Sequence, residues 1–75
     1  MSEPSAVTHA RLALLRDDIY GRLGETLRRA EAARAFLELA DDAGALYALN
    51  TLLATVRAIA ESGHELAALR KEGAR

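Results

Sequence analysis

Two histidines and one pair of aspartates are the side chains whose types and spacing could support chemistry. His64 is followed directly by Glu65, and a neighbouring carboxylate can raise the basicity of an imidazole that accepts a phosphoryl group. Asp41 and Asp42 place two carboxylates side by side, where a cation could bind. The chain has no cysteine, so thiolate nucleophiles and thiolate metal sites are excluded.

Each of these candidates has a simpler structural explanation. His64 and Glu65 are adjacent, so on a helix they point to different faces, and His9 lies far away in the sequence. Calcium takes about six to eight oxygen ligands, whereas Asp41 and Asp42 supply only two carboxylates that a helix cap also explains. We therefore predict surface histidines, no metal, no cofactor and no enzymatic activity.

The segment around His64 resembles one known kind of helix. His64-Glu65-Leu66, followed by Leu69 and Arg70, is similar to the phosphoacceptor helix of two-component signalling proteins. The resemblance implies histidine phosphotransfer within a helical dimer. The segment lacks the proline that usually follows, and the 75 residues hold no ATP-binding domain, so phosphotransfer ranks third among the functional hypotheses.

Alanine and leucine dominate the composition and indicate an all-α protein. Hydrophobic residues make up 51% of the 75 residues and aromatic residues only 4%, and alanine and leucine are the strongest helix formers. A domain this small buries only about 60% of the surface that its unfolded chain exposes. Without disulfides, we expect oligomerisation to supplement the core.

The spacing of apolar residues predicts two helices, over about residues 5–40 and 45–72, joined by a loop at 41–44. Ser2 or Ser5 would cap the first helix, Pro4 fits its first turn, and Gly44 is expected to take a positive φ in the loop. So short a loop makes the helices an antiparallel hairpin within one domain, residues 1–75. The expected core stripe of the first helix is Leu12, Leu15, Ile19, Leu23, Leu27, Ala30, Ala33 and Leu37.

The second helix has a heptad row that we expect to pack against this stripe. Folding the chain about the loop places Leu49 opposite Ala33 and Leu53 opposite Ala30, so that large side chains meet small ones, as close packing requires. The expected row is Leu46, Leu49, Leu53, Val56, Ala60, Gly63 and Ala67, with Ile59 and Leu66 beside it.

Glycines at positions 21, 24 and 63 lie inside the predicted helices, where each costs up to about 1 kcal/mol. Close approach of a neighbouring helix would explain them. Ser62 and Glu65 also match a capping box, so the alternative is a short third helix that begins at about residue 63.

Residues 43–56 carry no charge on any side of the second helix. A helix of this kind is normally buried, and one neighbouring helix cannot cover it. The simplest solution is a homodimer that forms a four-helix bundle, and a helical partner protein is the competing solution. We therefore predict a non-enzymatic protein–protein interaction module, a small dimeric regulator, adaptor or assembly subunit. Its predicted interface residues are Leu46, Tyr47, Leu49, Leu52, Leu53 and Val56.

Arginines of the first helix support the second hypothesis, which is RNA binding. Arg22, Arg28, Arg29 and Arg34 could contact phosphates, and the predicted architecture resembles the hairpin dimers of the repressor-of-primer type, which bind RNA. Glutamates are interleaved with these arginines, and the net charge is −1. Nucleic acid is therefore ranked below a protein partner.

Sequence features that direct a chain to a membrane are weak here. The uncharged stretch at 43–56 is shorter than the roughly 17–25 residues that a membrane span needs. Residues 1–5 lack the basic start and apolar core of a signal peptide. We expect a cytoplasmic protein without membrane association.

Overall fold

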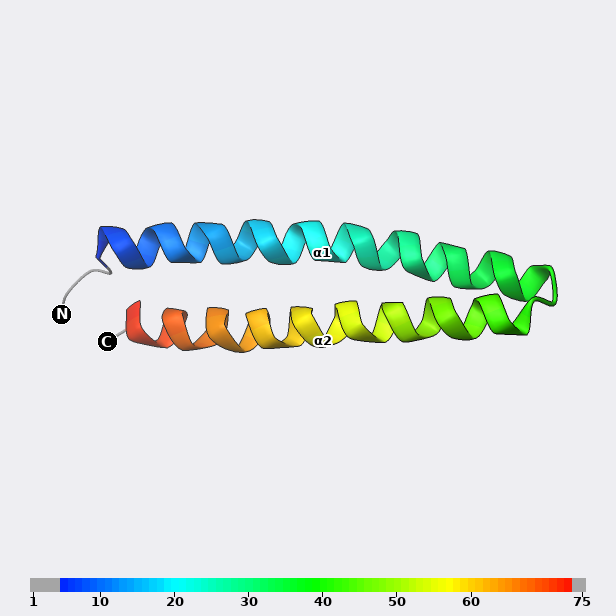
Figure 1. Ribbon diagram of the computed structural model, residues 1–75. Helices are drawn as coiled ribbons and strands as arrows, with labels where there is room; N and C mark the ends of the chain where they lie inside the picture. Colours follow the sequence, from blue (N-terminus) through cyan, green and yellow to red (C-terminus); the bar gives the residue numbers. More distant parts are fainter. Residues whose placement is uncertain (1–4, 74–75) are drawn as a thin grey trace.

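The computed structural model describes residues 5–73, which form an antiparallel α-helical hairpin (Figure 1). Helix α1 spans Ala6–Glu38 and helix α2 spans Asp42–Gly73. The hairpin measures 58 × 14 × 13 Å. The predicted all-α hairpin is confirmed, although α2 begins three residues earlier than expected and the connection is residues 39–41. We call the end where α1 begins and α2 finishes the open end.

Helix α1 begins with a side-chain cap. Ser5 is extended, with φ −67° and ψ 164°, and its Oγ accepts a hydrogen bond from the Thr8 amide at 3.1 Å. This bond satisfies one of the amide donors that a helix start leaves without a partner. Of the residues considered as helix starters, Ser2 and Pro4 lie outside the described residues.

The connection between the helices is a Schellman motif that ends α1. The Asp41 amide donates to the Phe36 carbonyl at 2.9 Å, and the Ala40 amide donates to the Leu37 carbonyl at 3.1 Å. Ala40 has a φ of 55°, the only positive φ among the described residues. The prediction that Gly44 takes a positive φ is therefore wrong.

Gly44 lies inside the first turn of α2, and Asp41 caps this helix. The Asp41 Oδ1 accepts from the Gly44 amide at 2.9 Å. A Cβ built on Gly44 would lie 2.5 Å from Cδ1 of Phe36, which is closer than real Cβ contacts allow. Position 44 thus requires glycine because the Phe36 ring packs against its backbone.

The two helices contact each other along one heptad row on each, which we call the hairpin seam. All of its side chains are buried or half-buried. On α1 the seam consists of Leu12, Leu15, Ile19, Arg22, Thr26, Arg29, Ala33 and Phe36. On α2 it consists of Ala45, Ala48, Leu52, Thr55, Ile59, Ser62, Leu66 and Leu69.

The row predicted for α2 differs from the seam by one residue. Leu49 and Leu53 are 44% and 47% exposed, so the pairing of these leucines with alanines of α1 is wrong. One residue corresponds to a rotation of about 100° around the helix axis. The small Ala45 and Ala48 face α1 instead, at 2% and 5% exposure, and the leucines beside them are turned outward.

Helix α2 continues without interruption through Ser62 and Gly63, so a third helix is not formed. Both residues of the supposed capping box have partners across the hairpin. The Ser62 hydroxyl donates to Asp18 Oδ2 at 3.1 Å, and Glu65 forms an ion pair with Arg11. These contacts hold the side chains in place within a continuous helix.

Candidate interaction surface

The hairpin has two flanks of opposite character, one on each side of the seam. Residues that immediately precede a seam residue lie on one flank of both helices, because the helices are antiparallel and face each other. This polar flank holds the ion pair between Arg11 and Glu65. It also holds Asp18 and Glu25, whose carboxylates bind the seam arginines of their own helix at 3.0 and 2.8 Å.

The ion pair between Glu25 and Arg29 affects titration. The Arg29 side chain donates hydrogen bonds to Glu25 Oε2 at 2.8 and 3.3 Å. Hydrogen bonding to the Arg29 guanidinium, together with its positive charge, holds the pKa of Glu25 below its ordinary value. Glu25 therefore stays ionised as the pH becomes mildly acidic.

Residues that immediately follow a seam residue form the opposite flank, which is lined with leucines. Its leucines and Val56 are between 44% and 66% exposed, and Tyr20, which follows the seam residue Ile19, is 82% exposed. We call this surface the apolar face, and it consists of Leu23, Leu27, Leu37, Leu46, Leu49, Leu53 and Val56.

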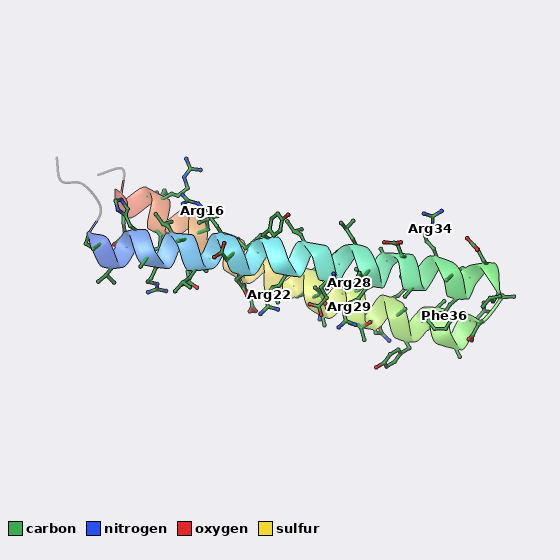
Figure 2. All side chains as sticks on the ribbon, turned by 90° about the horizontal axis from the view of Figure 1, so that it is seen from above. Arg16, Arg22, Arg28, Arg29, Arg34 and Phe36 are labelled. Atoms are coloured by element: carbon green, nitrogen blue, oxygen red, sulfur yellow. The ribbon has the colours of Figure 1, made fainter. Side chains whose placement is uncertain are left out.

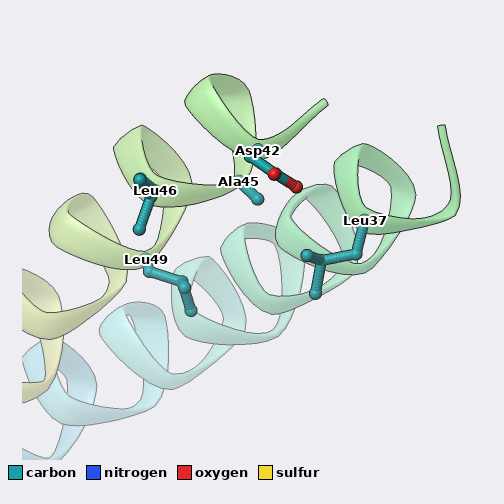
Figure 3. Close-up of a pocket in the computed structure, with 5 residues that line it drawn as sticks. All are labelled: Leu37, Asp42, Ala45, Leu46 and Leu49. Carbon is teal, nitrogen blue, oxygen red and sulfur yellow. The ribbon is translucent and has the colours of Figure 1, made fainter. Parts of the chain in front are cut away.

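A hollow near the connection is lined by apolar-face residues of both helices (Figure 3). Leu37 of α1 lies beside Leu46 and Leu49 of α2, around a space of about 280 Å³ that Ala45 and Asp42 complete. Because both helices supply walls, the apolar face is one surface of the hairpin rather than a property of α2 alone.

The structure places most of the predicted interface residues on the apolar face. Leu46, Leu49, Leu53 and Val56 lie there, whereas Leu52 is half-buried in the seam. Tyr47 is 71% exposed but lies about 100° further around α2 than Leu46, away from the face.

Sequence reasoning missed the contribution of α1 to this surface. Leu23, Leu27 and Leu37 were expected in the hairpin core, yet they are 49%, 66% and 57% exposed. Hydrophobic periodicity gives no signal for this exposure, because the seam residues that precede two of these leucines are the polar Arg22 and Thr26.

The arginines considered for RNA binding do not form one basic surface. Figure 2 shows Arg16 and Arg34 on one side of the hairpin and Arg22, Arg28 and Arg29 on the other. Arg22 and Arg29 are also paired with carboxylates of α1. The geometry thus divides and partly neutralises the positive charge.

The residues considered for chemistry remain separate. His9 and His64 are both exposed, and within residues 5–73 no three His, Asp or Glu side chains are grouped as a metal site would require. A second hollow lies along α1, lined by Glu31, Arg34, Ala35 and Glu38, and is a charged, open surface. We assign no catalytic role to it.

The hairpin exposes more surface than a compact protein of its mass. Its accessible surface is 5,695 Å², whereas a compact monomer of 8.1 kDa exposes about 4,500 Å². The excess is therefore about 1,200 Å². No large side chain among the described residues is fully buried.

Helix α2 also meets the length and composition criteria for crossing a membrane, with a mean hydropathy of 1.3 over its most apolar 18 residues. Core helices of soluble proteins meet the same criteria, so this property does not show whether α2 lies in a membrane or in water.

The fold and the surface together define a class: an all-α hairpin with one ion-paired flank and one unpartnered apolar face. Comparison with known protein families, curated sequences and solved structures gave no match.

Proposed function

We propose that this chain is a non-enzymatic protein–protein interaction module that acts as a homodimer. In this role it is a small helical regulator, adaptor or assembly subunit of the cytoplasm. The apolar face carries the proposal, because leucines of both helices are exposed side by side along one flank. A contiguous exposed apolar patch of this kind is typical of an interaction site.

The apolar face requires a partner that spans both helices. Stable protein interfaces bury about 800 Å² on each partner, so the partner has to cover the leucines of α1 and of α2 together. A second hairpin on the apolar face would complete a four-helix bundle, in which each helix has two neighbours.

Sedimentation equilibrium with charged variants tests the proposal. We expect wild type to be a dimer at micromolar concentration, and Leu49→Glu or Leu53→Glu to yield monomers, because a carboxylate would be buried without a partner. Leu52 is unsuitable for this purpose because it lies in the hairpin seam.

The matched control is Leu14→Glu, which changes a leucine that is 68% exposed and precedes a seam residue, on the polar flank. It should leave the dimer intact, and circular dichroism should show that all three variants remain helical. A monomeric wild type that binds lipid vesicles or a different protein through the same leucines would contradict the homodimer.

A further inference from the structure

We infer that the second copy covers the apolar face head to tail, so that each connection lies at the open end of the other hairpin and α2 packs along α2. The inference rests on the proposed self-association and adds the orientation of the two copies and the residues that meet. Its basis is the distribution of size and charge along the apolar face.

The α2 row on this face changes in size halfway along. It carries large residues from Leu46 to Val56 and continues toward the open end with smaller ones and a terminal arginine. A twofold axis between Val56 and Ala60 brings the large half of one copy onto the small half of the other, as close packing requires. The resulting contacts are Leu49 with Ala67, Leu53 with Gly63, and Val56 with Ala60.

The opposite orientation, with both connections at one end, does not place the large half of α2 on its small half. Each α2 would then lie on α1 of the other copy, with Leu53 near Leu27 and Val56 near Leu23 in the middle of the hairpin. Large side chains would face large ones at these levels, whereas head-to-tail packing sets them against Gly63 and Ala60.

Charge along α2 favours the same head-to-tail orientation. Asp42 lies in the hollow at the connection, whereas Arg70 follows a seam residue near the open end of the same helix. On α1, Arg16 follows a seam residue near the open end and Arg34 follows one near the connection, so the arginines of α1 favour neither orientation. Head-to-tail packing brings Asp42 of each copy toward the end that carries Arg70 of the other. The opposite orientation would bring the two Arg70 side chains to the same end, where like charges repel.

Gly63 provides the sharpest test, because no atom of the hairpin lies within 4 Å of a Cβ built there. The Cβ of a substituted residue therefore meets nothing in the isolated hairpin, whereas a leucine here would collide with Leu53 of the second copy. We expect Gly63→Leu to weaken dimerisation at least tenfold, and Gly63→Leu combined with Leu53→Ala to restore it. The matched control is Gly21→Leu on the polar flank, which is equally free of neighbours and should leave the dimerisation constant unchanged.

Orientation can be measured directly because the chain has no native cysteine. We would place a spin label on Ala43→Cys, close to the connection, and measure the distance between the two labels of a dimer by pulsed electron paramagnetic resonance. Head-to-tail packing predicts at least about 45 Å, from the helical rise of 1.5 Å per residue, and the opposite orientation predicts about 25 Å, the thickness of two helix layers.

The outcomes separate the two proposals. A monomeric wild type would contradict the proposed function itself. A dimer that shows the short distance at position 43, or that tolerates Gly63→Leu as well as Gly21→Leu, would overturn the orientation and leave the self-association in place.

Discussion

At the scale of single residues, Ala40 occupies a conformation that alanine disfavours. Its φ of 55° ends α1 in the left-handed region, which costs an L-residue with a Cβ roughly 1–2 kcal/mol. Ala40→Gly should therefore raise the free energy of unfolding by about 1 kcal/mol, measured by urea denaturation. The control Ala32→Gly, at an exposed position inside α1, should lower it by a similar amount.

Gly44 and Gly21 should respond in opposite ways to alanine. At Gly44 the new Cβ would meet the Phe36 ring, so Gly44→Ala should lower the free energy of unfolding by about 1–3 kcal/mol. At Gly21 no atom lies within 4 Å, so Gly21→Ala should raise it by about 0.5–1 kcal/mol. Thermal melts of both variants check the prediction, and equal shifts of the same sign would contradict it.

Glu25 gives the hairpin a small acid-sensitive contribution. Its pKa is lower in the folded state because Arg29 donates hydrogen bonds to it. The stabilisation is present above the ordinary pKa of a glutamate and disappears as the pH falls through the lowered value. A carbon-detected NMR titration of Glu25 should show this lowered pKa in wild type, and Arg29→Gln should return it toward the ordinary value.

At the scale of helices, the sequence predicted that two helices form and that they are antiparallel, but it predicted the wrong face of α2 for the contact. Two adjacent rows of α2 are apolar, and the pattern selected the row that has more leucines within residues 43–56. The helices instead meet through Ala45 and Ala48, whose small side chains permit close approach. Hydrophobic periodicity identifies a helix and its apolar side, but it does not say which of two neighbouring rows faces which partner.

The difference of one residue between the predicted row and the seam of α2 also explains which part of the apolar face could be predicted. The lack of charge around residues 43–56 correctly directed attention to exposed leucines of α2, while the role of α1 depends on the path of the seam. Arg22 and Arg29 lie in that seam because their aliphatic stems can pack while their charged ends reach carboxylates. A pattern that assigns arginine only to the surface cannot place the seam there.

The polar seam makes the contact between α1 and α2 weaker than it could be. Thr55 is 7% exposed, and its hydroxyl donates to the Thr51 carbonyl at 3.1 Å within the same helix. Thr55→Val keeps the shape and adds buried apolar surface, so it should raise the free energy of unfolding by about 0.5–1 kcal/mol. Chemical denaturation checks this, and a loss of stability would mean that the hydroxyl contributes more than its apolar replacement.

At the scale of the whole molecule, no large side chain among the described residues is fully buried, and the apolar face is exposed to water. We therefore expect the stability of the fold to depend on association with a second copy. If folding and dimerisation are coupled, the melting temperature should rise with protein concentration. Calorimetry over a hundredfold concentration range should show this rise for wild type and a flat response for Leu49→Glu. A wild-type melting temperature that does not change with concentration would contradict coupling.

The three-residue connection determines the order in which the hairpin closes. Contacts beside residues 39–41 join segments that are neighbours in the chain, whereas the ion pair between Arg11 and Glu65 closes a loop of more than fifty residues. Contacts between the helices should therefore form first beside the connection and last at the open end, and they should break in the reverse order. Amide hydrogen exchange should be slowest in the helical turns flanking the connection and progressively faster toward Ala6 and Gly73.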